Sequence, residues 1–124
     1  DWRWVPPGGR RSIRDIVDHL GARYVWDSQA FGDGSIHWNR PGSAPVLAAE
    51  ATPAEAEEWL RDAYGRLRGH VAALADDAEL DRERMTPQGV MRPTRFIVTT
   101  MIEHDLYHCG EVNHIRALRQ GDDY

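Results

Sequence analysis

Two histidines four positions apart, His104 and His108, are the residues whose spacing points most directly to chemistry. On a helix, side chains at i and i+4 share a face with Cβ atoms roughly 5–6 Å apart. Both imidazoles can then reach one divalent cation at the ~2.0–2.1 Å typical of Zn–N bonds. The pair also falls on an apolar stripe with Ile97, Met101 and Ile115, where an unpaired polar group costs on the order of 1–3 kcal/mol. The spacing therefore predicts a metal site, although a single buried histidine is more often a hydrogen-bonded core residue.

The predicted metal site needs a third ligand from another part of the chain. The other histidines of the sequence are His19, His37, His70 and His114. On a helical wheel of 100° per residue, His19 lies at the edge of the apolar stripe of a first predicted helix, and His70 has a similar position on a second. Periodicity does not choose between His19 and His70.

A zinc-protease reading of the same segment is an alternative. Histidines at 104, 108 and 114 have the spacing of the extended protease signature, with Asp105 where that signature has its catalytic glutamate. The signature breaks its helix at a glycine three residues after the second histidine, and Glu111 stands there in this chain. In a continuing helix His114 points about 120° away from His108, so the match is superficial.

Three amphipathic helices must position these residues. The first is expected to start at a Ser12 cap paired with Asp15, and the second at a Thr52 cap paired with Glu55. Their predicted ranges are 13–29, 53–75 and 94–119. The connection 31–51 contains glycines and prolines together with aromatic residues, which predicts a packed loop beside the site. Strand signals are too weak to predict a sheet.

Composition limits the function classes. The chain has 124 residues, 41% of them apolar, which fits one domain over 1–124. Fifteen basic against twenty acidic residues give a net charge of −5, the wrong sign for a protein that binds nucleic acid or an anionic membrane. No apolar run is long enough to span a bilayer and no secretion signal opens the chain. The prediction is a cytoplasmic protein that acts on a small molecule.

Nearly the whole chain resembles the DinB/YfiT-like superfamily of metalloenzymes, in particular its short actinobacterial-type members. The resemblance rests on the runs SIRDIVDHL, AFGDGSIHW, LADDAEL and RPTRFIVTTMIEHDLYHCGEVNHIRAL, and the block HDLYHCGE is its most specific part. It implies an all-α four-helix bundle with one divalent metal ion, zinc or else nickel, bound by three histidines. By position these are His19, His104 and His108. His70 is then an edge residue and Cys109 a small core residue.

The resemblance also implies an activity. Relatives include low-molecular-weight-thiol transferases and a thiol-dependent isomerase, and all basic residues here are arginine, as in a GC-rich genome. The expectation is a metal-dependent S-transferase that uses mycothiol as co-substrate. A metal-dependent hydrolase and a non-catalytic metal- or small-molecule-binding bundle are the alternatives. Since only neutral imidazole binds metal, affinity is expected to fall as the pH drops through about 6.5.

Two further expectations concern the surroundings of the site. Glu111 is a candidate for an acid/base group or for a residue that orients His108, or else pairs with Arg116 or Arg119. Tyr107, Trp26 and Trp38 are candidates for the pocket wall. In the family the first helix precedes the segment that reads DWRWVPPGG here, so this chain should supply three of the four helices. An N-terminal helix or a second copy, in a homodimer, is expected to fill the remaining groove.

Overall fold

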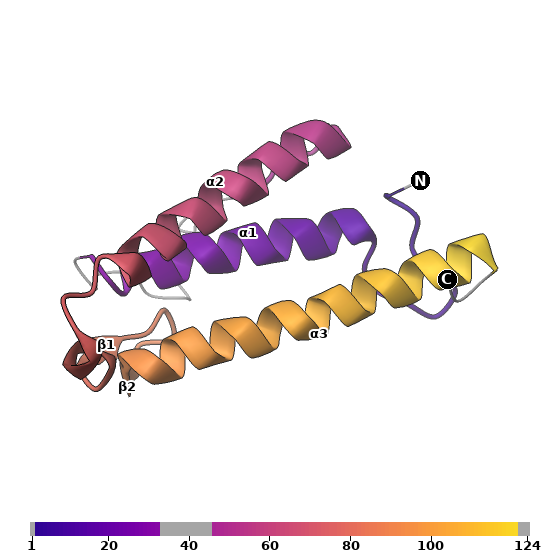
Figure 1. Ribbon diagram of the computed structural model, residues 1–124. Helices are drawn as coiled ribbons and strands as arrows, with labels where there is room; N and C mark the ends of the chain where they lie inside the picture. The colour runs from indigo at the N-terminus through magenta and orange to yellow at the C-terminus, as the bar shows by residue number, and fades with distance from the viewer. Residues whose placement is uncertain (1, 33–45, 122–124) are drawn as a thin grey trace.

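Three long helices and a small hairpin make up the computed structural model, which describes residues 2–32 and 46–121 (Figure 1). The elements are α1 (Ile13–Gln29), α2 (Pro53–Ala72), the 3-10 helix η1 (Asp77–Leu80), β1 (Glu83–Met85), β2 (Met91–Pro93) and α3 (Thr94–Gln120). The three predicted helices are present, with α2 three residues shorter than expected. The all-α prediction missed the antiparallel β1–β2 pair, which joins Arg84 to Arg92 across its middle.

Helix α1 is the central element of the bundle. Figure 1 shows α1 and α2 running in the same direction, while α3 returns antiparallel from the hairpin. Helix α1 packs against both other helices, and a cavity of about 310 Å³ separates α2 from α3. Residues of all three helices form the main core: Ile16, Leu20, Tyr24, Ala63, Leu67, Met101 and Ile115. No helix in the described ranges is both long and apolar enough to cross a membrane.

The starts of α1 and α2 follow from local sequence. Asp15 accepts a hydrogen bond from the Ser12 backbone N–H at 2.9 Å, while the Ser12 hydroxyl accepts one from the Asp15 N–H. Thr52 and Glu55 form the same reciprocal pair. These capping boxes satisfy backbone donors that the first helical turn leaves unpaired, so both helices begin where the sequence predicts.

The start of α3 depends on the hairpin instead. No side chain caps this helix at Pro93. The backbone N–H of Thr94 donates to the Arg82 carbonyl at 2.9 Å, and the Thr94 hydroxyl donates to the same oxygen at 2.8 Å. Thr94 is fully buried. Tertiary contacts therefore set the register in which α3 presents its histidines.

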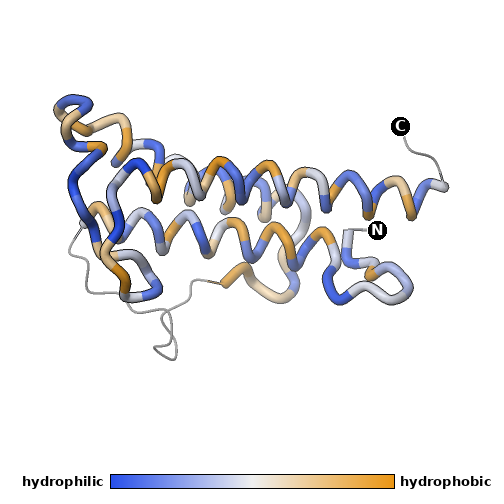
Figure 2. Tube along the Cα trace, turned by 90° about the horizontal axis from the view of Figure 1, so that it is seen from below, coloured by the Kyte–Doolittle hydropathy of each residue, from blue (hydrophilic) through white to orange (hydrophobic). Residues whose placement is uncertain are grey.

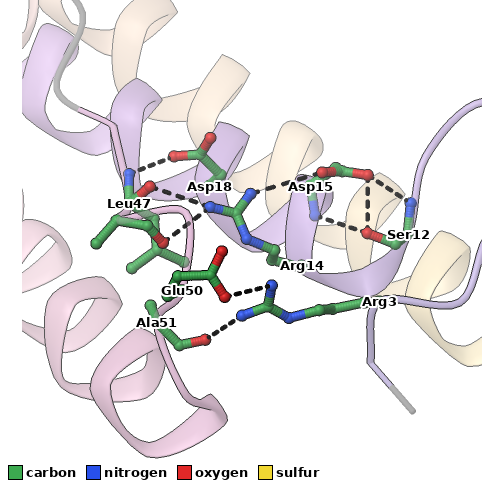
Figure 3. A network of polar contacts seen from close by, with 9 residues as sticks. Arg3, Ser12, Arg14, Asp15, Asp18, Leu47, Glu50 and Ala51 are labelled. Atoms are coloured by element: carbon green, nitrogen blue, oxygen red, sulfur yellow. Dashed lines mark hydrogen bonds and ion pairs between the residues drawn. The ribbon is translucent and has the colours of Figure 1, made fainter.

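The described end of the 31–51 connection is tied to α1 by side-chain hydrogen bonds (Figure 3). Arg14 donates to the carbonyls of Leu47 and Ala48 at 3.1 and 3.0 Å, and Asp18 accepts from the Leu47 N–H at 2.7 Å. Arg3 adds a bond to the Ala51 carbonyl. This part of the connection is packed as expected. His37 and Trp38 lie outside the described residues.

One prediction on α3 is wrong: Cys109 is exposed rather than a small core residue. Leu118, near the end of the same helix, is 51% exposed. Figure 2 shows polar and apolar residues alternating turn by turn along the helices, as amphipathic packing on one side requires. A cavity lies between α2 and α3; a groove left for a fourth helix, and the N-terminal helix or second copy that would fill it, stay predictions.

Close packing of α1 on α2 generates a first testable prediction. The Trp59 ring lies where a side chain at Gly21 would begin, so Gly21→Ala should overpack this contact and lower the free energy of unfolding by about 1–3 kcal/mol. Gly65, on α2, has open space where its own Cβ atom would be. Gly65→Ala should raise the free energy of unfolding by about 0.5–1 kcal/mol, because alanine restricts the unfolded chain. Urea unfolding of both variants checks this; equal effects would contradict the close approach.

Candidate metal centre

Three imidazoles meet between α1 and α3. His19 Nε2 lies 2.9 Å from His104 Nε2, and His108 Nε2 lies 3.2 Å from the same atom. One ligand atom from each ring falls within 4.8 Å of the others. Two nitrogens bound to a tetrahedral zinc ion at ~2.0–2.1 Å are separated by about 3.3 Å, so the observed spacing needs little adjustment to hold an ion. The side chains expected to converge therefore do so.

Burial keeps two of these rings in the form that binds metal. Desolvation, followed by the neighbouring charge of His108, lowers the pKa of His104 to about 4. The same two causes lower the pKa of His19. Both rings are therefore neutral at neutral pH. Competition between protons and a metal for these two rings is therefore expected at a lower pH than the unperturbed value near 6.5 implies.

Glu111 and Arg11 hold the ring of His108, the third histidine of the cluster. Glu111 Oε2 lies 2.8 Å from His108 Nδ1, and a carboxylate can only accept there, so Nδ1 carries the proton and Nε2 turns its lone pair to the cluster. Arg11 donates to the same carboxylate at 3.2 Å. His108 is 2% exposed. This arrangement of carboxylate, imidazole and cation site is the usual way in which a ligand histidine is oriented.

Glu111 pairs with Arg11 and not with Arg116 or Arg119, the alternative that the sequence offered. The partner comes from the segment before α1, one hundred positions away in sequence, and Arg119 lies over the Trp4 ring instead. Helical spacing only identifies partners on the same helix. In the sequence, this contact is hinted at only by the adjacent Arg10 and Arg11, which directly precede the Ser12 cap.

The other candidate ligands lie elsewhere. His70 is exposed, and its ring stacks 6.0 Å from that of Phe31. His114 is exposed on α3, which runs unbroken through Glu111. The protease signature requires a helix break at that position, so its geometry is absent. Of the described histidines, those in the cluster are the ones expected from the resemblance.

The aromatic residues expected to wall the pocket differ in position and exposure. The Tyr107 ring lies 5.0 Å from the His108 ring but is 64% exposed. Trp26 is buried in α1. Burial raises the pKa of the Tyr24 hydroxyl well above its usual range, and the hydrogen bond that this hydroxyl donates to Asp105 raises it further. Tyr24 and Asp105 line the cavity between α2 and α3, a pairing that the sequence reasoning missed.

Comparisons with known proteins add one finding. A family model described as the DinB superfamily matches residues 1–112 of the chain, which include α1, α2, the hairpin and the histidine cluster. Searches of curated proteins and of solved structures found no match.

A second prediction concerns metal binding. Replacing His104, which contacts both other rings, with alanine should weaken zinc binding by roughly 100-fold or more, because the site loses a ligand at its centre. His70→Ala is the matched control, since that exposed ring lies away from the cluster. Competition with a chromophoric chelator measures both affinities. Equal zinc affinity in parent and His104→Ala would exclude this cluster as the binding site.

A third prediction concerns the stability of the protein without metal. Below about pH 6.5 the unfolded chain protonates His19 and His104, whereas the folded chain holds both pKa values down. The unfolded state then binds more protons, so the free energy of unfolding should decrease as the pH falls from about 7 towards 4. Urea unfolding in the presence of a chelator measures the slope. His104→Gln should flatten it and His70→Gln should not; a slope unaffected by His104→Gln would contradict the assignment.

Proposed function

The chain belongs to the DinB superfamily, and from this premise we propose that it is a metal-dependent enzyme that transfers a low-molecular-weight thiol to a small substrate. The observation that carries the proposal is the cluster of three imidazoles, which supplies three nitrogen donors from α1 and α3. Structural zinc sites use four protein ligands, whereas catalytic sites use three and leave one position for water or substrate. The donor set therefore supports a catalytic site.

Imidazole donors suit zinc, with nickel as the alternative. His19, His104 and His108 would hold the ion. When bound, the ion lowers the pKa of a coordinated thiol and so supplies a thiolate at neutral pH. The co-substrate we propose is mycothiol, because the superfamily that the sequence resembles includes low-molecular-weight-thiol transferases and because all basic residues are arginine, as in a GC-rich genome.

Glu111 acts in this proposal by orienting His108. Its carboxylate oxygen contacts Nδ1, on the side of the ring opposite the cluster, and Arg11 keeps the carboxylate in place. The hydrogen bond maintains the tautomer in which Nε2 offers its lone pair. This geometry supports a positioning role over direct proton transfer to substrate.

The cavity between α2 and α3 supports a pocket for the apolar part of a substrate. Its walls include Leu67, Val71 and Met101, and Tyr24 and Asp105 supply polar groups. One of these wall residues, Asp105, directly follows His104 on α3. The raised pKa of Tyr24 keeps its hydroxyl protonated and able to donate a hydrogen bond.

The proposal is tested by metal analysis of untagged protein together with a thiol-conjugation screen. Mycothiol and a panel of small electrophiles are incubated with zinc-loaded protein, and conjugates are detected by mass spectrometry. Conjugation that disappears in His108→Ala supports the transferase. Hydrolysis of an ester or amide panel without conjugation would favour the hydrolase, and absence of both reactions would favour a binding protein.

A fourth prediction separates positioning from ligation. Glu111→Gln should retain zinc but weaken zinc affinity or turnover by roughly 10–100-fold, because the amide is a poorer acceptor for the His108 N–H. Glu103→Gln, at an exposed position of the same helix, should match the parent. Chelator competition and the rate of conjugation are the measurements. A Glu111→Gln protein that matches the parent in both would remove Glu111 from the site.

A further inference from the structure

A cavity of about 240 Å³ lies where the segment before α1 meets the last turns of α3 (Figure 1). Its walls combine two indole rings, two arginines and further apolar and polar side chains: Trp2, Trp4, Ile13, Ile115, Arg116, Arg119 and Gln120. Ile115 follows His108 by seven residues, which is about 10.5 Å along a helix that rises 1.5 Å per residue. None of the three clustered histidines lines this cavity, so it is separate from the metal centre.

Tertiary contacts hold the two indole rings in place. Trp4 packs with Ile13 against the main core. Trp2 packs against the smaller core cluster around Leu47, and its carbonyl accepts a hydrogen bond from the Arg14 backbone N–H at 3.0 Å. Both rings are half-buried. A ligand ring therefore meets an aromatic surface that is already formed, which lowers the entropic cost of binding.

The charged wall of the cavity comes from α3. Arg116 and Arg119 are three positions apart and so are neighbours on the helix surface. Neither takes part in an ion pair among residues 2–32 and 46–121, and the described lining contains no acidic residue. The Arg119 guanidinium carbon lies 5.7 Å from the Trp4 ring centroid. Cations favour the last turn of any helix, but here they face a preformed aromatic wall.

These walls define the chemistry of a ligand. Two guanidinium groups are balanced by a group with two negative charges. A phosphate monoester carries about −1.5 to −2 at pH 7 and accepts paired hydrogen bonds from arginine. A carboxylate has a single charge and leaves one guanidinium unbalanced. Indole rings stack with other flat rings, and the cavity is slightly smaller than the roughly 300–1,000 Å³ of most ligand sites. One ring with its phosphate suits this space.

We propose that the cavity binds a small phosphate monoester, with its phosphate at Arg116 and Arg119 and its ring against Trp2 and Trp4. The bound molecule bridges the segment before α1 and the end of α3. Binding forms and breaks no covalent bond and needs no metal ion. The inference therefore goes beyond the proposed transferase and does not rest on it.

The test uses phenyl phosphate as the probe and the full chain, kept free of zinc by a chelator so that phosphate has no metal ion to bind. Titration calorimetry measures the affinity, and NMR follows the indole N–H signals. We expect phenyl phosphate to shift the signals of Trp2 and Trp4 and to leave that of Trp26 unchanged, since Trp26 is buried elsewhere in α1. Shifts that spare Trp2 and Trp4 would overturn the proposal.

Two further ligands separate the contributions of ring and charge. Phenol lacks the phosphate and inorganic phosphate lacks the ring, so each should bind at least tenfold more weakly than phenyl phosphate. Equal binding of phenol would show an apolar pocket without anion recognition. Equal binding of inorganic phosphate would show an adventitious ion only. Either result would contradict the proposed site.

Arg116→Gln is the decisive variant, because its exposed side chain can be shortened without loss of an ion pair. It should weaken phenyl phosphate binding roughly tenfold, as expected for the loss of a charge-assisted hydrogen bond. Arg95→Gln is the matched control, since that exposed arginine of α3 pairs with Asp81 and does not line the cavity. Equal affinity in the parent and Arg116→Gln would exclude the arginines as the anion site.

The sequence offers one rival for the two arginines. Asp122 and Asp123 directly follow Gly121, and their carboxylates carry the charge that a phosphate would supply. The double variant Asp122→Asn, Asp123→Asn distinguishes the two explanations. Phenyl phosphate binding by the parent, within about threefold of the double variant, supports the proposal. Binding that appears only in the double variant would overturn it.

Discussion

Burial of three imidazoles at the contact of α1 with α3 is the constraint on which the site depends. Their Nε2 atoms approach to 2.9 and 3.2 Å, and such a cluster cannot accommodate several protonated rings at once. Desolvation and mutual repulsion keep His104 and His19 neutral. The energetic requirement of the cluster, neutral rings with lone pairs directed to one point, is also the requirement of a metal ligand set.

The remaining elements meet this constraint in different ways. Helix α1 packs closely on α2 through Gly21 and Trp59, which fixes the helix that carries His19. The hairpin fixes the start of α3 through the buried Thr94, and so the phase of the other two histidines. Glu111 and Arg11 then set the tautomer of His108. Helix packing, the hairpin and the hydrogen bonds of Glu111 thus orient the same three nitrogen atoms.

Two cavities on either side of the α1–α3 contact differ in character. The one towards α2 is mostly apolar, with Tyr24 and Asp105 as its polar pair. The one towards the hairpin contains two arginines and the buried Asp27, whose pKa desolvation raises to about 6.

The starts of α1 and α2 could be predicted from the sequence because their capping boxes are local, and so could the 3.6-residue periodicity of all three helices. The shared face of His104 and His108 could be predicted too, since the helix that contains them fixes their spacing. The choice of His19 over His70 came from family resemblance, and periodicity could not make it. Three features could not be predicted from the sequence: the contact of Arg11 with Glu111, the exposure of Cys109 and the cavity beside Arg23. These depend on how separate helices and the hairpin meet, and contacts between residues distant in sequence leave no periodic signal within either segment.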